Sequence, residues 1–182
     1  MPVTYAARHV LEDHISGFEA APNPHHVSIL RSTVVISALA HAGHEADIEE
    51  ALTNLEDTHL RFCAPGEWLV ISDSVSAETI ERYLRDLGPR LSFVDQSDGR
   101  VVLAIRGPRV RSILAKCTAL DLHPDVFAIG QSTNCQICHV AANLARTGQD
   151  TFEIIVMRSF AGFLFDEISE MGREFALTAG FA

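Results

Sequence analysis

Short apolar runs alternate with amphipathic segments along most of this chain. Runs rich in β-branched residues predict buried strands, because such side chains pack well on a pleated surface. Apolar positions that recur every three and four residues predict helices. The expected strands span residues 27–30, 33–39, 68–72, 92–95, 101–105, 136–144 and 152–157. The expected helices span residues 46–55 and 160–174, and two more begin at Ser76 and Pro108.

Glycine and proline mark the boundaries between these elements. Gly107 ends the strand before it, and Pro108 suits the first turn of a helix, where its missing N–H is not needed. The sequence Asp98-Gly99 between two strands predicts a hairpin. Because strands, helices and hairpins interleave, we expect an α+β fold with mixed, mainly antiparallel sheets and packed helices.

The chain is long enough for one large domain or two small ones. We expect residues 1–25 to form an irregular N-terminal arm. Residues 26–182 are then expected to form one α+β region, which can divide into two subdomains near residues 90–100.

The net charge is −10, and most of it lies in the first half of the chain. This balance argues against nucleic acid as a partner, because a basic footprint is missing. The second half holds a local basic cluster, which consists of Arg100, Arg106, Arg109, Arg111 and Lys116. A solvated face is the simpler interpretation of this cluster, and a docking patch for an acidic partner or a phosphate is the alternative.

Nothing in the sequence indicates a membrane or an export route. No apolar run approaches the roughly 18 residues of a membrane-spanning helix. The first residues do not follow the charged-then-apolar pattern of a signal peptide. We therefore expect a cytoplasmic location, where the four cysteines should be reduced.

Residues 135–139 (CQICH) match the pattern of covalent haem attachment. The pattern falls in an expected strand, where side chains three apart point to opposite faces, and this disfavours two thioether bonds. A zinc site would need further ligands, and Cys63 and Cys117 do not form a second such pair. We interpret Cys135 and Cys138 as ordinary half-buried cysteines, and the sequence leaves open whether they bind a metal.

Histidines form the other candidate sites. His25-His26 and the pair His41 and His44 could be metal ligands, but no spacing completes a set, so loop or surface positions are favoured. His123 with Asp121 and Ser97-Asp98 could suggest a catalytic triad, but His123 precedes a proline and the sequence contains no nucleophile motif such as GxSxG. A structural hydrogen bond in a turn is the preferred interpretation of His123.

Several segments resemble the gamma subunit of heterotetrameric sarcosine oxidase, a reduced relative of the aminomethyltransferase (glycine-cleavage T-protein) fold. The segments are residues 64–69 (APGEWL), 94–99 (VDQSDG), 106–108 (RGP), 120–124 (LDLHP) with Phe127, 152–156 (FEIIV) and 158–161 (RSFA). The resemblance implies a non-catalytic, structural subunit of a complex that demethylates sarcosine to glycine. It also implies alpha, beta and delta partner subunits, which would carry FAD, FMN, NAD and tetrahydrofolate. No glycine-rich nucleotide loop is present in this chain.

One comparison within the resemblance concerns folate. Aminomethyltransferases carry a GYTGEDGFEI-like turn and strand whose acidic residues help to hold tetrahydrofolate. This chain keeps Glu153 in the FEI position and lacks the YTGE part, so Glu153 is at most a weak remnant of such a site. We prefer to interpret Glu153 as a charged residue at the start of an edge strand.

Two other functions stay open. One is membership of a sister complex, such as an N-methylglutamate dehydrogenase, since the substrate pocket would lie in another chain. The other is a free-standing folate-binding, aminomethyltransferase-like protein. The sequence does not tell which N-methyl amino acid is used.

Three residues of the basic cluster form a candidate partner surface. Arg109 and Lys116 are seven residues apart and would share one face of the helix that begins at Pro108. With Arg106 at the strand end, we expect them to face an acidic region of a larger subunit.

Overall fold

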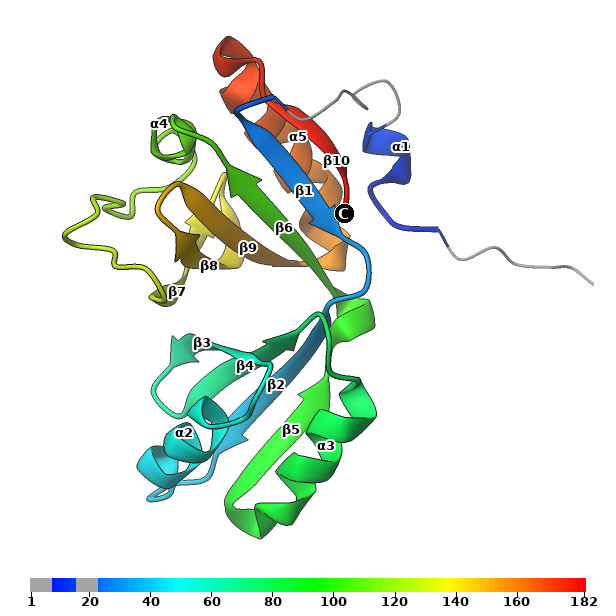
Figure 1. Ribbon diagram of the computed structural model, residues 1–182, viewed down its shortest axis with the longest axis vertical. Coiled ribbons are helices and arrows are strands. Elements are labelled where there is room, and N and C mark those ends of the chain that lie inside the picture. Colours follow the sequence, from blue (N-terminus) through cyan, green and yellow to red (C-terminus); the bar gives the residue numbers. More distant parts are fainter. Residues whose placement is uncertain (1–7, 16–22) are drawn as a thin grey trace, which may run out of the picture.

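The computed structural model describes residues 8–15 and 23–182, which form two β-sheets placed one above the other (Figure 1). The larger sheet has six strands in the order β10-β1-β6-β9-β8-β7. They are β1 (His26–Leu30), β6 (Arg100–Arg106), β7 (Ser132–Ile137), β8 (Val140–Gly148), β9 (Thr151–Met157) and β10 (Thr178–Phe181). Neighbouring strands are antiparallel, except β1 and β10, which are parallel.

The smaller sheet has four antiparallel strands in the order β3-β4-β2-β5. They are β2 (Val34–Ala40), β3 (His59–Ala64), β4 (Glu67–Ser72) and β5 (Leu91–Asp95). Helices α2 (Glu45–Thr53) and α3 (Ala77–Asp86) cover one face of this sheet. The backbone N–H of Thr79 donates to Ser76 Oγ at 3.3 Å, so Ser76 caps α3 as the sequence predicts. The expected α+β class with mainly antiparallel sheets is confirmed.

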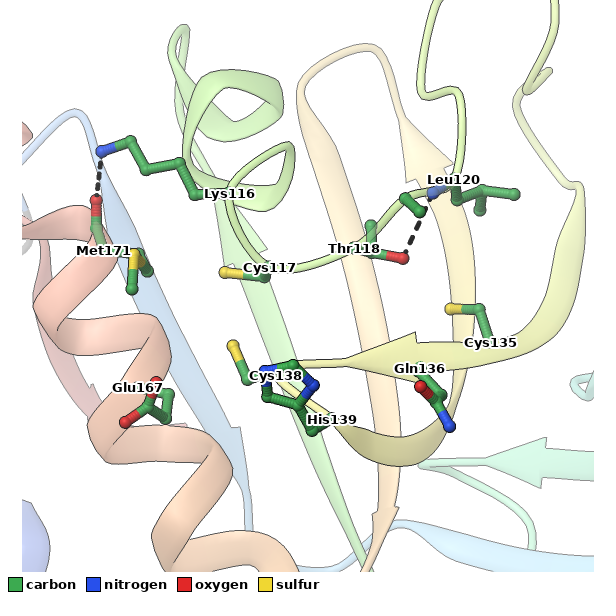
Figure 2. A pocket seen from close by; sticks show the side chains of 11 residues that line it. Lys116, Cys117, Thr118, Leu120, Cys135, Gln136, Cys138, His139, Glu167 and Met171 are labelled. Atoms are coloured by element: carbon green, nitrogen blue, oxygen red, sulfur yellow. Dashed lines mark hydrogen bonds between the residues drawn. The ribbon is translucent and has the colours of Figure 1, made fainter.

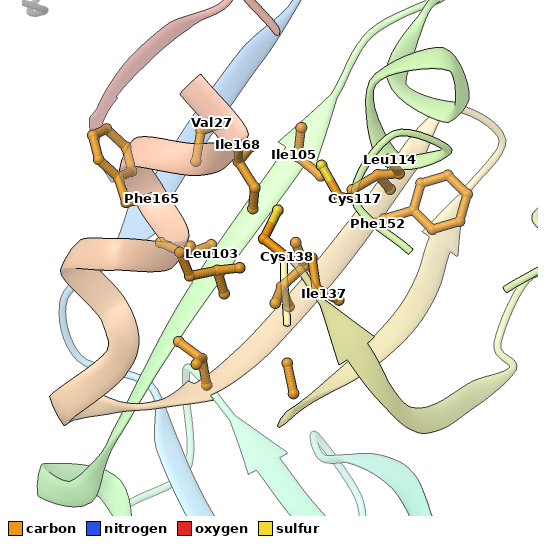
Figure 3. Close-up of a cluster of buried hydrophobic side chains, with 14 of the residues drawn as sticks. Val27, Leu103, Ile105, Leu114, Cys117, Ile137, Cys138, Phe152, Phe165 and Ile168 are labelled. Carbon is orange, nitrogen blue, oxygen red and sulfur yellow. The ribbon is translucent and has the colours of Figure 1, made fainter. Parts of the chain in front are cut away.

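Each sheet has its own apolar core, and a small third cluster lies between the sheets. Helices α4 (Val110–Leu114) and α5 (Ala161–Gly172) cover the larger sheet. Figure 3 shows this cluster, with Leu103 on the side of α5 and Phe152 beside Leu114 of α4. The cluster between the sheets consists of Val35, Leu69, Ile71, Val102 and Ile155. Strand β6 is therefore buried on both faces, which explains its almost unbroken apolar run.

The expected hairpin around Asp98-Gly99 is wrong. Strand β5 pairs with β2, whereas β6 pairs with β1 and β9 of the other sheet. Between them, a short 3₁₀ turn spans Ser97–Gly99. The backbone N–H and hydroxyl of Ser97 donate to Asp95 Oδ1 at 2.9 and 2.6 Å, which tightens this turn. The Asp-Gly signal thus marks a crossing between sheets, and a division into subdomains near residues 90–100 stays a prediction.

The strand expected over residues 136–144 is also wrong, because two strands meet there. Strand β7 ends at Ile137 and β8 begins at Val140, with Cys138 and His139 in the connecting turn. Their φ angles are 48° and 68°, which suit a tight two-residue hairpin. Strands β3 and β10 were not anticipated.

Helix α5 confirms an amphipathic helix near the C-terminus but turns a different face to the core. Leu164 and Ile168 are buried, as expected. Phe160 and Phe163 fit the apolar spacing of the helix expected over residues 160–174, yet they are 51% and 50% exposed. A short 3₁₀ turn (Arg158–Phe160) leads into the helix, whose buried residues are Ala161, Leu164, Phe165, Ile168 and Gly172.

The described part of the N-terminal arm packs against α5. It contains one turn of helix, α1 (Glu12–Ile15), whose Ile15 is buried in the larger core. His14 Nδ1 lies 2.9 Å from Asp166 Oδ1, and Arg158 donates to the carbonyl of Arg8 at 3.3 Å. The rest of the predicted irregular arm, residues 1–7 and 16–22, lies outside the described residues. Among the helices of residues 8–15 and 23–182, none is long and apolar enough to cross a membrane.

Replacing Gly107 by alanine should destabilise the fold. Gly107 has φ 137°, and an added Cβ would collide with the carbonyl oxygen of Pro24 and lie 2.9 Å from His25 Cα. We expect Gly107→Ala to lower the free energy of unfolding by about 1–3 kcal/mol, measured by urea denaturation. Gly99→Ala is the control, because an added Cβ there meets no atom within 4 Å. Equal losses in the two variants would contradict this account.

Candidate functional site

A cleft of about 660 Å³ lies between the loop after α4, the β7–β8 turn and α5. Three thiols line it, those of Cys117, Cys135 and Cys138 (Figure 2). The backbone N–H of Cys138 donates to the carbonyl of Cys117 at 2.7 Å, which joins the turn to the loop. Lys116 and Glu167 lie at its α5 side.

Burial makes these thiols poor nucleophiles. Burial, and after it the neighbouring Cys138, raise the pKa of Cys117 to about 12. Burial also raises the pKa of Cys135 and of Cys138. In residues 8–15 and 23–182, no group of three or more His, Cys, Asp or Glu side chains is placed so as to hold a metal ion. Whether Cys135 and Cys138 bind a metal in solution stays a question for experiment.

Glu153 lies in an inter-sheet ion pair, and not at a sheet edge. Its strand β9 lies between β6 and β8, and Glu153 Oε2 accepts from Nη2 of Arg61 on β3 of the smaller sheet. The Arg61 side chain is 5% exposed and that of Glu153 is 20% exposed. Our edge-strand interpretation of Glu153 is therefore wrong. The carboxylate binds a guanidinium of its own chain.

Hydrogen bonds beside this pair also join the sheets. The backbone N–H of Phe62 on β3 donates to Ser132 Oγ at 2.7 Å, and Asn143 Nδ2 on β8 donates to the carbonyl of Phe62 at 2.8 Å. Asn143 is only 2% exposed. Sequence reasoning missed Arg61 and Asn143, although a polar residue inside an apolar strand could have signalled both.

A second buried arginine fixes the loop that contains the LDLHP segment. Arg146 is 5% exposed, and its guanidinium donates to the carbonyls of Phe127 at 2.8 Å and of Pro124 at 3.3 Å. Arg111 donates to the carbonyl of Leu122 at 3.2 Å and pairs with Asp150 at 2.6 Å. The loop is therefore held at several backbone positions, and the LDLHP segment has a structural role.

His123 belongs to a turn of this loop, in agreement with the structural interpretation. Its backbone N–H donates to Asp121 Oδ1 at 2.9 Å, and its Nδ1 accepts from the backbone N–H of Asp125 at 3.3 Å. Its side chain is 61% exposed.

We expect loop or surface positions for the four histidines near the N-terminus, and for His26 this expectation is wrong. His26 is buried in β1, where its Nδ1 lies 2.8 Å from Thr178 Oγ1 and where burial lowers its pKa. His25 Nε2 accepts from the backbone N–H of Arg109 at 3.2 Å. His41 is exposed and contacts Ser92. His44 is the N-cap residue of α2.

The basic cluster does not form one helical face. Helix α4 spans only Val110–Leu114, so Arg109 and Lys116 lie beyond its two ends, and the expectation that they share a face is wrong. Lys116 Nζ donates to the carbonyl of Met171 at 2.8 Å and pairs with Glu174. Arg106 and Arg109 are exposed, so a partner contact at these two residues stays a prediction.

The comparisons with known proteins agree with this architecture. A family model described as "Sarcosine oxidase, gamma subunit family" matches residues 32–173. The chain belongs to this family. The resemblance inferred from the sequence segments is thereby confirmed.

Individual relatives extend the match. "Sarcosine oxidase subunit gamma" of Corynebacterium sp. (strain P-1) is 29% identical over 126 residues, which cover 66% of this chain and 62% of that protein. A chain of the heterotetrameric sarcosine oxidase from Corynebacterium sp. U-96 has the same fold, with a TM-score of 0.81 at 20% identity, over 93% of this chain and 96% of that chain. Aminomethyltransferase T from Bartonella henselae has a TM-score of 0.60 at 15% identity, over 93% of this chain and 50% of that one.

The thiols of the cleft should react slowly in the native protein. At pH 8, a pKa of about 12 leaves only about one Cys117 in ten thousand as thiolate, the form that attacks iodoacetamide. We expect Cys117 to be alkylated at least about a hundredfold more slowly in the native than in the urea-unfolded chain, followed by mass spectrometry. Equal rates in the two states would contradict the burial argument. The half-buried Cys135 serves as an internal comparison and should react first.

Breaking the Arg61–Glu153 pair should destabilise the fold. Arg61→Met or Glu153→Gln removes one partner of a largely buried pair, which costs about 3 kcal/mol of unfolding free energy. The double variant should lose less than the sum of the single variants, because neither partner is left alone. Urea denaturation of the four proteins measures this coupling.

Arg82→Met is the matched control for this cycle. Its partner is Glu78, and the two side chains are 66% and 81% exposed, so the loss should be below about 1 kcal/mol. Additive losses at residues 61 and 153 would show that the two side chains act independently.

Proposed function

We propose that this chain is a structural subunit of a heterotetrameric complex that oxidatively demethylates sarcosine to glycine. The observation that carries the proposal is the match to a chain of a heterotetrameric sarcosine oxidase over nearly the full length of both. The aligned region spans about three fifths of the gamma subunit from strain P-1. The activity and the partners of the whole complex are therefore part of our proposal for this chain.

The chemistry of the described residues supports a non-catalytic role. The carboxylate of Glu153, the candidate folate remnant, is bound by Arg61. The thiols of the cleft beside α5 have raised pKa values. The two most buried arginines, Arg61 and Arg146, bind groups of their own chain. These carboxylate and guanidinium groups are thus engaged in holding the fold, and the thiols are poor nucleophiles.

The proposal extends to the rest of the complex. Alpha, beta and delta subunits would be the partners, and they would carry FAD, FMN, NAD and tetrahydrofolate. The assembly would act in the cytoplasm. A sister complex that oxidises another N-methyl amino acid, such as N-methylglutamate, would use this chain in the same way.

Co-expression tests the proposal. We expect the chain to co-elute with the alpha, beta and delta subunits of a sarcosine-oxidase-like complex from the same organism. The four-subunit complex should consume oxygen with sarcosine, and omission of this chain should lower the yield of assembled complex. The isolated chain should be colourless and should not turn over sarcosine.

Three results would contradict the proposal. They are turnover by the isolated chain, a visible flavin or haem spectrum in it, and failure to associate with any of the three subunits. Titration of the isolated chain with a reduced folate separates the free-standing alternative, because saturable binding would favour a folate-binding protein. A substrate panel that includes N-methylglutamate identifies the sister complex.

A further inference from the structure

Four exposed apolar side chains lie at the end of β5 and along the segment that leads from β9 into α5, and none of them belongs to the buried clusters of the described residues. Val94, Met157, Phe160 and Phe163 are 59%, 43%, 51% and 50% exposed. We call these four residues, together with Asp95 and Asp98, the junction patch. Single exposed apolar residues are ordinary, but a contiguous group marks an interaction surface.

Helical geometry aligns three of these side chains. Met157 is the N-cap of the 3₁₀ turn that ends at Phe160, and residues three apart eclipse each other in such a turn. Phe160 is in turn the N-cap of α5, so Phe163 follows it on the same side. The residues that α5 buries are others, among them Leu164, Phe165 and Ile168. The result is a ridge of one methionine and two phenylalanines, directed away from the core.

Carboxylates lie beside this ridge. Met157 borders a shallow hollow of about 330 Å³ that is also lined by Asp95 and Asp98. Both aspartates are exposed, and neither is in a salt bridge within residues 8–15 and 23–182. Asp95 accepts hydrogen bonds only from Ser97 in this part of the chain, so its carboxylate keeps free lone pairs.

We propose that the junction patch is a docking surface for a larger subunit of the proposed complex. The partner would present an apolar pocket for Phe160 and Phe163, with arginine or lysine side chains opposite Asp95 and Asp98. Aromatic anchors at the centre with charged side chains at the rim are typical of a protein interface. This inference rests on the proposed function, and it places the contact away from Arg106 and Arg109.

The charge of the patch disfavours a second copy of this chain as the occupant. A symmetric dimer through the patch would bring the unpaired aspartates of two chains together, each with a net charge of −10. Like charges at an interface oppose association. A partner with basic residues instead gains attraction from the same carboxylates.

The first test is a double variant, Phe160→Ser with Phe163→Ser. Both side chains are half exposed, so the melting temperature of the isolated chain should change little. The Kd for the complex of the other three subunits, measured by biolayer interferometry, should rise at least tenfold. The matched control is Val126→Ser with Ile129→Ser, two residues 56% and 58% exposed on the loop after α4, which should bind like the wild type.

A second variant tests the charges. Asp95→Asn with Asp98→Asn keeps an acceptor for Ser97 but removes both charges. It should slow association at low salt and weaken the dependence of the association rate on salt, because rim charges mainly set that rate. An unchanged association rate at low salt would overturn the charge part of the inference.

A footprint on the wild type covers the case in which a variant does not fold. Hydrogen–deuterium exchange should show slower exchange in residues 93–99 and 157–165 when the complex forms. Protection confined to other segments would overturn the inference, as would a phenylalanine variant that folds and binds like the wild type. Loss of binding in Arg106→Glu with Arg109→Glu alone would locate the interface at the basic residues instead.

The outcomes separate the two proposals. If the wild type does not bind the other subunits, the proposed function fails, and this inference fails with it. If the wild type binds and the junction patch is neither protected nor sensitive to substitution, only this inference fails. If the isolated chain dimerises and the phenylalanine variant abolishes the dimer, the occupant is a second copy, and the inference is wrong.

Discussion

A buried guanidinium on one sheet and a carboxylate on the other hold the two halves of this protein in one arrangement. The apolar cluster between the sheets is small, and apolar contacts are not directional. Arg61 supplies direction, because its planar fork must meet Glu153 across the gap. Removing a guanidinium from water is costly, so sliding of the sheets that parted the pair would leave a buried charge unmatched. The pair therefore specifies the arrangement more than it adds stability.

The same physical device fixes the long loop after α4. Backbone carbonyls without a strand or helix partner must find donors elsewhere. Arg146 supplies donors to the carbonyls of Pro124 and Phe127, and Arg111 does so for Leu122. The loop thus has no regular structure and yet is held in place. The buried guanidinium groups of Arg61 and Arg146 stabilise the fold, so neither is free to bind a substrate.

The sequence predicted most strands and the four longer helices, because their signals are local. It did not predict which strands pair, since β5 and β6 are neighbours in sequence but belong to different sheets. The turn at Cys138-His139 was missed because left-handed backbone is unusual without glycine or asparagine. The role of Arg61 was missed because it depends on a residue of the other sheet. A charge inside a strand acquires meaning only when its partner on another sheet is known.

The hydrogen bonds and ion pairs within this chain determine which surface is left for a partner. Of the five residues in the basic cluster, Arg100 donates to Gln96, Arg111 pairs with Asp150, and Lys116 pairs with Glu174. A cationic docking face is thereby reduced to Arg106 and Arg109. The apolar ridge at the start of α5 belongs to none of the buried clusters of the described residues, because α5 buries other side chains in the core. Water contact of half-exposed phenylalanines is unfavourable in proportion to their apolar area, and an apolar surface of another chain can relieve it without unfolding this one.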